Sequence, residues 1–121
     1  MPPADFTTTF AVLKAVLAKY APKLTVVADK PGNYYLDAGY SKEWNKTIFF
    51  GAVRVGKNYV SFHLMPVYGC PDLLDDLSDD LKKRMQGKAC FNFKTITPAQ
   101  VKELKALTKR GFEKFKKLGW A

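Results

Sequence analysis

Apolar residues recur with helical spacing near both ends of the chain. The first stripe predicts a helix over residues 9–20, which Pro22 ends. The second stripe runs from Val101 to Leu118 and predicts a helix at the end of the chain. Thr97 is placed to cap this helix, and Pro98 suits its first position because the proline nitrogen needs no partner there.

Between these helices the apolar pattern alternates with a period of two, which is typical of β-strands. It predicts five strands, at residues 24–28, 33–37, 47–55, 58–65 and 89–94. The segment Asp29-Lys30-Pro31-Gly32 is a strong turn signal between the first two strands. Gly56-Lys57 is the expected turn between the third and fourth strands. The sequence therefore predicts two hairpins and a later single strand.

A third helix is predicted over Asp72–Gln86, with Pro71 in its first turn and Gly87 as its stop. One face of this helix carries Leu73, Leu74, Leu77, Leu81 and Met85. The resulting order is α-β-β-β-β-α-β-α. Antiparallel hairpins flanked by helices predict an α+β fold with one mainly antiparallel sheet and the helices packed on one face. The whole chain, residues 1–121, is expected to form a single domain.

The predicted second hairpin also assigns side chains to the two faces of the sheet. A turn at Gly56-Lys57 places one set of residues on the core face: Phe49, Gly51, Val53, Val60, Phe62 and Leu64. The same turn places a second set on a partly covered face: Phe50, Ala52, Arg54, Tyr59, Ser61 and His63. Nearly complete burial is expected for six positions, namely Phe62, Leu64, Phe91, Phe93, Leu104 and Phe115.

Composition narrows the class of protein. A hydrophobic content of 47% is that of a globular domain, and two cysteines without a CxxC spacing exclude a disulfide framework and a zinc knuckle. No run approaches the roughly 20 apolar residues of a membrane span, and the first residues lack the pattern of a signal peptide. A soluble, cytoplasmic protein with no membrane partner is expected. The net charge of +9 favours encounters with anions of any kind.

The partly covered sheet face is the predicted binding site. Its polar members, together with those of the fifth strand, are Arg54, Tyr59, His63, Cys90, Asn92 and Lys94. Cations beside an aromatic ring suit a small anion, a nucleotide-like ligand or an acidic protein surface. The spacing of the residues shows no catalytic constellation and no glycine-rich phosphate loop, so a non-catalytic binding domain without a cofactor is predicted.

Two other clusters give alternative predictions. Asp72, Asp75, Asp76, Asp79 and Asp80 lie at helical spacing and could hold a hard cation such as iron, or could simply complement the helix dipole. Lys102, Lys105, Lys109 and Lys116 share one face of the last helix. That face could contact the phosphates of a nucleic acid, or could be a solvated surface.

Two segments resemble a known family. The first joins Phe50-Gly51-Ala52-Val53 to Gly56-Lys57-Asn58-Tyr59-Val60-Ser61-Phe62-His63-Leu64-Met65-Pro66. The second is Leu81-Lys82-Lys83-Arg84-Met85-Gln86-Gly87-Lys88-Ala89-Cys90-Phe91-Asn92-Phe93. Over about the latter two thirds of its length the chain is similar to the YdhG-like family, a group named largely for unknown function. The resemblance implies a compact α+β domain likened to the frataxin fold, and it implies an iron role because some relatives are described as intracellular iron chaperones.

Overall fold

The computed structural model describes residues 6–69, 71–75, 77–86 and 90–120. Five strands form one antiparallel sheet in the order β1-β2-β3-β4-β5. The strands are β1 (Thr25–Lys30), β2 (Asn33–Ser41), β3 (Lys46–Val55), β4 (Val60–Leu64) and β5 (Cys90–Phe93). The helices are α1 (Phe6–Ala18), α2 (Met65–Gly69), α3 (Asp79–Lys82) and α4 (Pro98–Lys117), with short 3-10 helices η1 (Ala21–Lys23) and η2 (Pro71–Leu74).

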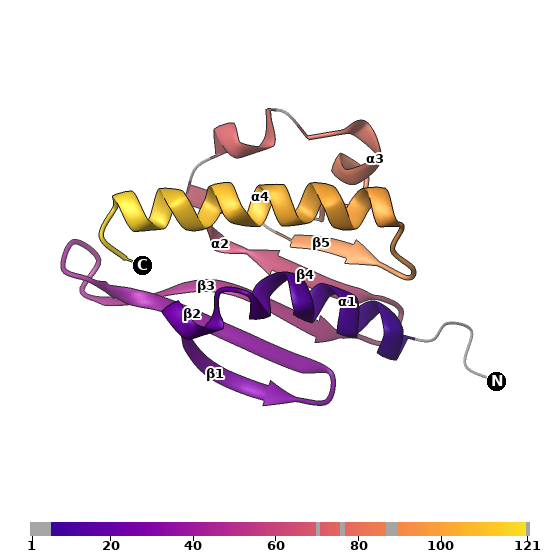
Figure 1. Cartoon of the computed structure of the whole chain (residues 1–121), viewed down its shortest axis with the longest axis horizontal. Coiled ribbons are helices and arrows are strands. Elements are labelled where there is room, and N and C mark those ends of the chain that lie inside the picture. Colours follow the sequence, from indigo (N-terminus) through magenta and orange to yellow (C-terminus); the bar gives the residue numbers. More distant parts are fainter. Residues whose placement is uncertain (1–5, 70, 76, 87–89, 121) are drawn as a thin grey trace.

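The two long helices, α1 and α4, lie across the same face of the sheet (Figure 1). Strand β1 forms one edge of the sheet, and the segment that carries η2 and α3 lies beyond β5 at the other edge (Figure 1). The predicted α+β class and the order α-β-β-β-β-α-β-α are confirmed, and the two long helices pack on one face as predicted. Among the described residues, no helix combines the length and apolarity needed to cross a bilayer.

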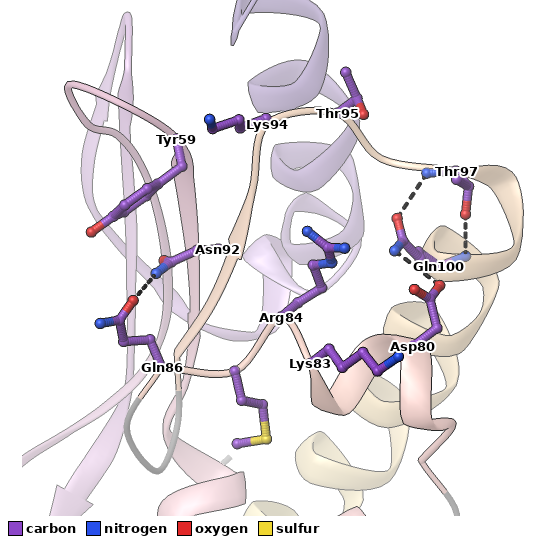
Figure 2. Close-up of a pocket in the computed structure, with 11 residues that line it drawn as sticks. Tyr59, Asp80, Lys83, Arg84, Gln86, Asn92, Lys94, Thr95, Thr97 and Gln100 are labelled. Atoms are coloured by element: carbon purple, nitrogen blue, oxygen red, sulfur yellow. Dashed lines mark hydrogen bonds between the residues drawn. The ribbon is translucent and has the colours of Figure 1, made fainter.

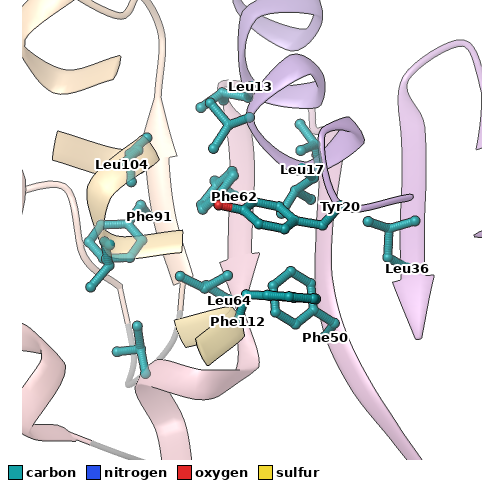
Figure 3. Close-up of a cluster of buried hydrophobic side chains, with 14 of the residues drawn as sticks. Leu13, Leu17, Tyr20, Leu36, Phe50, Phe62, Leu64, Phe91, Leu104 and Phe112 are labelled. Atoms are coloured by element: carbon teal, nitrogen blue, oxygen red, sulfur yellow. The ribbon is translucent and has the colours of Figure 1, made fainter. Parts of the chain in front are cut away.

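Aromatic rings join the helices to the sheet (Figure 3). The ring of Phe50 on β3 meets Phe112 and Phe115 of α4 edge to face, with centroids 6.0 and 5.8 Å apart. Tyr20 stacks on Phe112 at 4.8 Å. The six positions expected to be nearly fully buried are all at most 2% exposed, which confirms them: Phe62, Leu64, Phe91, Phe93, Leu104 and Phe115.

The predicted continuous helix over Asp72–Gln86 is wrong. In its place the structure has η2, then a break, then the single turn of α3. Ser78 starts the new turn, because its hydroxyl accepts a hydrogen bond of 3.2 Å from the amide of Leu81, while its own amide donates to Glu103 of α4 at 2.9 Å. The apolar positions Leu73, Leu77 and Leu81 are nevertheless buried. The predicted stop, Gly87, lies outside the described residues.

Phe49 and Phe50 occupy the opposite faces to those predicted. Leu36 of β2 pairs with Gly51 while the next residue pairs with Phe49, so Phe50 is an extra residue in a β-bulge. A bulge interrupts the alternation of side chains, and Phe50 therefore joins Gly51 on the helix-covered face. Phe49 lies on the other face, where its ring is 4.7 Å from that of Tyr35.

The turn between β3 and β4 is longer than predicted. Val55 pairs with Val60, and the amide of Gly56 donates to the carbonyl of Tyr59 at 2.8 Å, so the connection spans residues 56–59. The register is displaced by two residues, which leaves every side chain of β4 on its predicted face. His63 consequently pairs with Ala52 rather than with Phe50. Tyr59 belongs to the loop rather than to the strand.

Candidate functional site

Strands β3, β4 and β5 are neighbours, so their outward side chains form rows across the face that α1 and α4 leave open. Arg54, Ser61 and Asn92 make one row. The next row contains His63 and Cys90. Alternation alone did not establish that these strands are neighbours. Because they are, four of the six residues predicted to bind ligand share one surface: Arg54, His63, Cys90 and Asn92.

The side chains in these rows hydrogen-bond one another. The Ser61 hydroxyl donates to Asn92 Oδ1 at 2.9 Å, and the Cys90 thiol donates to the same oxygen at 3.5 Å. Cys90 Sγ lies 3.9 Å from His63 Nε2. Burial lowers the pKa of His63, and the nearby Arg54 guanidinium lowers it further. Burial also raises the pKa of the Cys90 thiol, which its hydrogen bond with Ser61 opposes. Both pKa shifts favour the neutral form of the group.

The two other predicted residues are Tyr59 in the β3–β4 loop and Lys94 after β5, and both line a cavity of about 440 Å³ beside the edge strand β5 (Figure 2). We call it the edge cavity. Asn92 belongs to both places, since its side chain also lines the cavity and donates to Gln86 Oε1 at 3.0 Å. The structure therefore divides the predicted site in two. Tyr59, Asn92 and Lys94 line the edge cavity, whereas Arg54, His63 and Cys90 stay on the open face.

The wall of the edge cavity beyond β5 is built by residues 84–86. They run antiparallel to β5, with Met85 bridged to Phe91. The amide of Asn92 donates to the carbonyl of Arg84 at 2.8 Å, and that of Gln86 donates to the carbonyl of Cys90 at the same distance. This pairing fixes Arg84 beside the strand, and its guanidinium points into the space between β5 and the start of α4 (Figure 2).

Positive charge dominates the edge cavity. Lys83, Arg84 and Lys94 line it, and Asp80 is the one acid among the described lining residues. The Asp80 carboxylate accepts a hydrogen bond of 3.1 Å from Gln100, a neutral partner. Within the part of the chain that the structure describes, none of the three cations forms an ion pair with a carboxylate. Three cations against one carboxylate leave an excess of positive charge.

Gln100 is held in place by the beginning of α4. The Thr97 hydroxyl accepts from the amide of Gln100 at 3.2 Å, and the Gln100 side chain accepts from the amide of Thr97 at 3.0 Å. This is a capping box, as the Thr97 cap predicted from sequence allows. The same side chain thus caps the helix and binds Asp80.

Sequence reasoning missed Lys83 and Arg84 as lining residues. Their cationic run matched the end of a helix, where positive charge complements the dipole. The helix instead ends at Lys82, and the chain turns to pair with β5. The available signal was the closeness in sequence of this run to the strand that carries Asn92.

The aspartates predicted as an alternative metal site do not share one helix, because η2 and α3 are separate. The Asp72 carboxylate oxygen Oδ2 lies 3.8 Å from Lys114 Nζ, and Asp75 and Asp79 are exposed. Asp76 lies outside the described residues. No cluster of three or more His, Cys, Asp or Glu side chains suited to a metal is found over residues 6–69, 71–75, 77–86 and 90–120.

The lysines predicted as an alternative polyanion site are exposed on α4: Lys102, Lys105, Lys109 and Lys116. Three of them, Lys102, Lys105 and Lys109, flank the groove between α1 and α4. Lys102 and Lys105 line one hollow of this groove with Val12 of α1, and Lys105 and Lys109 line another with Lys19. No acidic side chain is among the described residues that line either hollow.

Comparison of the chain with protein-family models, with curated proteins and with solved structures found no match. The resemblance to the YdhG-like family therefore stays a prediction.

Proposed function

We propose that this chain is a cytoplasmic, non-catalytic binding domain whose ligand is a small anion held in the edge cavity. The observation that carries the proposal is the convergence of Lys83, Arg84 and Lys94 on one cavity whose single described acid is Asp80. A guanidinium presents a planar pair of donors that matches a carboxylate or a phosphate, and ammonium groups add charge without fixed geometry. The Tyr59 ring provides a surface for an apolar or planar part of the ligand.

Binding is favoured over catalysis by the state of the one reactive pair in the described sites. A thiol acts as a nucleophile only as the thiolate, and a neighbouring imidazole assists by taking the proton. The raised pKa of Cys90 and the lowered pKa of His63 oppose that transfer. Among the described residues, no carboxylate hydrogen-bonds the His63 ring to reverse this tendency.

The test compares Arg84, in the segment beside β5, with Arg54 on β3. Arg84→Ala removes the guanidinium from the edge cavity, whereas Arg54→Ala removes one from the open face. Calorimetric titration at low ionic strength would use inorganic pyrophosphate, citrate and a nucleoside monophosphate, with the uncharged nucleoside for comparison. Arg84→Ala should weaken anion binding by at least about tenfold, since a hydrogen bond between charged groups contributes about 1.5–3 kcal/mol.

Arg54→Ala serves as the control and should bind the anions as the wild type does. If Arg54→Ala abolishes binding and Arg84→Ala does not, the ligand occupies the open face and the edge cavity is the wrong site. If none of the three anions binds the wild type, the proposal fails.

A second candidate function is the binding of a polyanion along the groove between α1 and α4. The observation that favours it is the row of lysines over two hollows that no described acid lines. Phosphates along a nucleic-acid backbone are suited to such a row, because contacts to them require charge and reach rather than a fixed pattern of donors.

A further inference from the structure

A second cavity, of about 310 Å³, lies at the end of the sheet where β2 turns into β3, and it shares no residue with the edge cavity. We call it the aromatic cavity. Rings from three parts of the fold line it: Trp44 before β3, Tyr68 on α2, and Phe115 and Trp120 at the end of α4. Lys46 is the one charged side chain among its described lining residues.

The end of α4 fixes the position of Trp120. Gly119 adopts a φ of +82°, the amide of Trp120 donates to the carbonyl of Phe115 at 2.9 Å, and the amide of Gly119 donates to Lys116 at 3.1 Å. These bonds form a Schellman motif, in which an apolar residue after the glycine packs against the last turn of the helix. The Trp120 and Phe115 rings meet edge to face at 5.2 Å.

Trp120 is also tied to the sheet. Its carbonyl accepts a hydrogen bond from the amide of Gly39 on β2, which brings the end of the chain over the β2–β3 end of the sheet (Figure 1). A side chain at position 39 would interfere, because its Cβ would lie 2.8 Å from the Trp120 carbonyl oxygen. Two separate interactions therefore hold one wall of the aromatic cavity.

Trp44, which also lines the aromatic cavity, is positioned by the turn that precedes β3. Its amide donates to the hydroxyl of Ser41 at 3.2 Å, and Ser41 is itself only 1% exposed. Asn45 adopts a positive φ of 54°, and its side chain accepts a hydrogen bond from the Tyr40 hydroxyl. This turn is internally bonded, so the Trp44 ring is presented by an ordered piece of backbone.

The rim of the aromatic cavity exposes large aromatic side chains. Trp44 is 62% and Tyr68 is 57% exposed, whereas Phe115 below them is 2% exposed. Exposed aromatic rings gathered around a concave site with a buried floor are characteristic of ligand-binding sites. The volume lies near the lower end of the range for small-molecule pockets, which is about 300–1,000 Å³.

We propose that the aromatic cavity binds a small aromatic molecule that carries one anionic group. The rings would take up the flat apolar part, and Lys46 would attract the anion. Aromatic linings also attract cations through the faces of their rings. Lys46 opposes a cationic ligand by like-charge repulsion and decides the sign of the charge. This proposal is independent of the function assigned to the edge cavity.

The protein carries its own reporter for this test. The sequence contains two tryptophans, Trp44 and Trp120, and both line the aromatic cavity. Tryptophan fluorescence would be followed during titration with three molecules that share one skeleton and differ in charge: phenylpropanoate, phenylpropanol and phenylpropylammonium. The full chain should show a saturable change with phenylpropanoate, a weaker affinity for phenylpropanol and the weakest for phenylpropylammonium.

Two variants separate the contributions of ring and charge. Tyr68→Ala should weaken the binding of phenylpropanoate by about tenfold, because stacking against one aromatic ring contributes on the order of a factor of ten in affinity. Lys46→Gln should remove the preference for phenylpropanoate over phenylpropanol and leave phenylpropanol binding unchanged. Lys42→Gln, at an exposed lysine of the same turn that does not line this cavity, should behave as the wild type. Arg84→Ala should also leave this titration unchanged.

Several results would overturn the proposal. One is a fluorescence that responds to none of the three molecules. A second is an equal loss of phenylpropanoate binding in Lys42→Gln and Lys46→Gln, which would indicate a general charge effect. A third is a tryptophan spectrum that depends on protein concentration without added ligand, together with a dimer in sedimentation, which would assign the aromatic cavity to a second copy of the chain.

Discussion

The chemistry of single residues on the open face is governed by desolvation. His63 and Cys90 lie side by side, half-buried, and each is shifted towards its neutral form. An exposed pair of the same residues would exchange a proton more readily, because water stabilises both the thiolate and the imidazolium. Arg54 strengthens the effect on His63, since a fixed positive charge disfavours a second one nearby.

The lowered pKa of His63 predicts how stability depends on pH. When the chain unfolds, His63 regains its ordinary pKa of about 6.5 and binds a proton that the folded state resists. The free energy of unfolding should therefore fall as pH decreases from about 7 through 6.5 towards the folded-state pKa. Because His63 is the one histidine of the chain, His63→Gln should flatten this dependence.

Urea denaturation at a series of pH values would measure this effect. Ser61→Ala alters the same face without removing a titrating imidazole and should keep the slope of the wild type. Parallel profiles for the wild type and His63→Gln would show that the histidine pKa is the same in both states.

At the scale of elements, the sequence of α4 reflects both its end caps and its packing against α2. Thr97 and Gln100 cap its beginning, and the Schellman motif at Gly119 closes its end. Its middle contains Gly111, a residue that weakens an isolated helix. The glycine faces α2, where an added Cβ would lie 2.8 Å from Cβ of Pro66. Close packing of α4 on α2 explains why position 111 is a glycine.

Gly111→Ala is therefore expected to destabilise the protein. Helix propensity favours alanine by about 1 kcal/mol, but forcing a methyl group into a packed contact costs about 1–3 kcal/mol. We expect a net loss of about 1 kcal/mol in the free energy of unfolding, measured by chemical denaturation. Gly111→Ala should cost less in a Pro66→Gly background than in the wild type, because the Pro66 Cβ and Cγ that the added methyl group would meet are then absent.

Ala106→Gly provides the reference for this prediction, since position 106 is exposed on the same helix. It should cost about 1 kcal/mol from propensity alone. If Gly111→Ala stabilised the protein by that amount, the contact with Pro66 would have no energetic consequence.

At the scale of the molecule, charge is distributed unevenly. The net charge is +9, and lysines line the groove between α1 and α4 as well as the edge cavity. A field of this kind accelerates encounters with anions and makes them sensitive to salt. Anion binding could depend on the net charge of the whole protein or on the local row of lysines, and variants with equal net charge distinguish the two.

The polyanion candidate predicts that mixed-sequence DNA binds with an affinity that falls steeply as salt increases, measured by fluorescence anisotropy. Lys102→Glu/Lys109→Glu should weaken binding to all sequences alike and reduce the salt dependence, because phosphate contacts carry no base information. Lys30→Glu/Lys57→Glu makes the same change in net charge at two exposed positions, the last residue of β1 and the β3–β4 turn, and should have a smaller effect. An equal loss of DNA affinity in both variants would show that net charge, and not the row of lysines on α4, determines binding.

Features that depend on neighbours in sequence were predictable from the sequence. The turn at Gly32, with its positive φ of 78°, and the cap at Thr97 depend on a few consecutive residues. The five strands and the order of elements follow from periodicity, which burial on one face imposes on local sequence. Phe91 and Phe93 are buried as alternation indicates. Alternation also placed His63, Cys90 and Asn92 on one face correctly.

Features that depend on contacts between distant segments were decided by the tertiary structure. The bulge at Phe50 is defined by the pairing of β3 with β2, and Ser78, which caps α3, hydrogen-bonds to Glu103 of the distant helix α4. Both candidate cavities have the same origin. Arg84 lines one cavity with Lys94 because residues 84–86 run beside β5. Trp44 shares a cavity with Trp120 because the carbonyl of Trp120 is hydrogen-bonded to β2. Periodicity records which side of an element is buried, but it contains no information about which distant segment covers it.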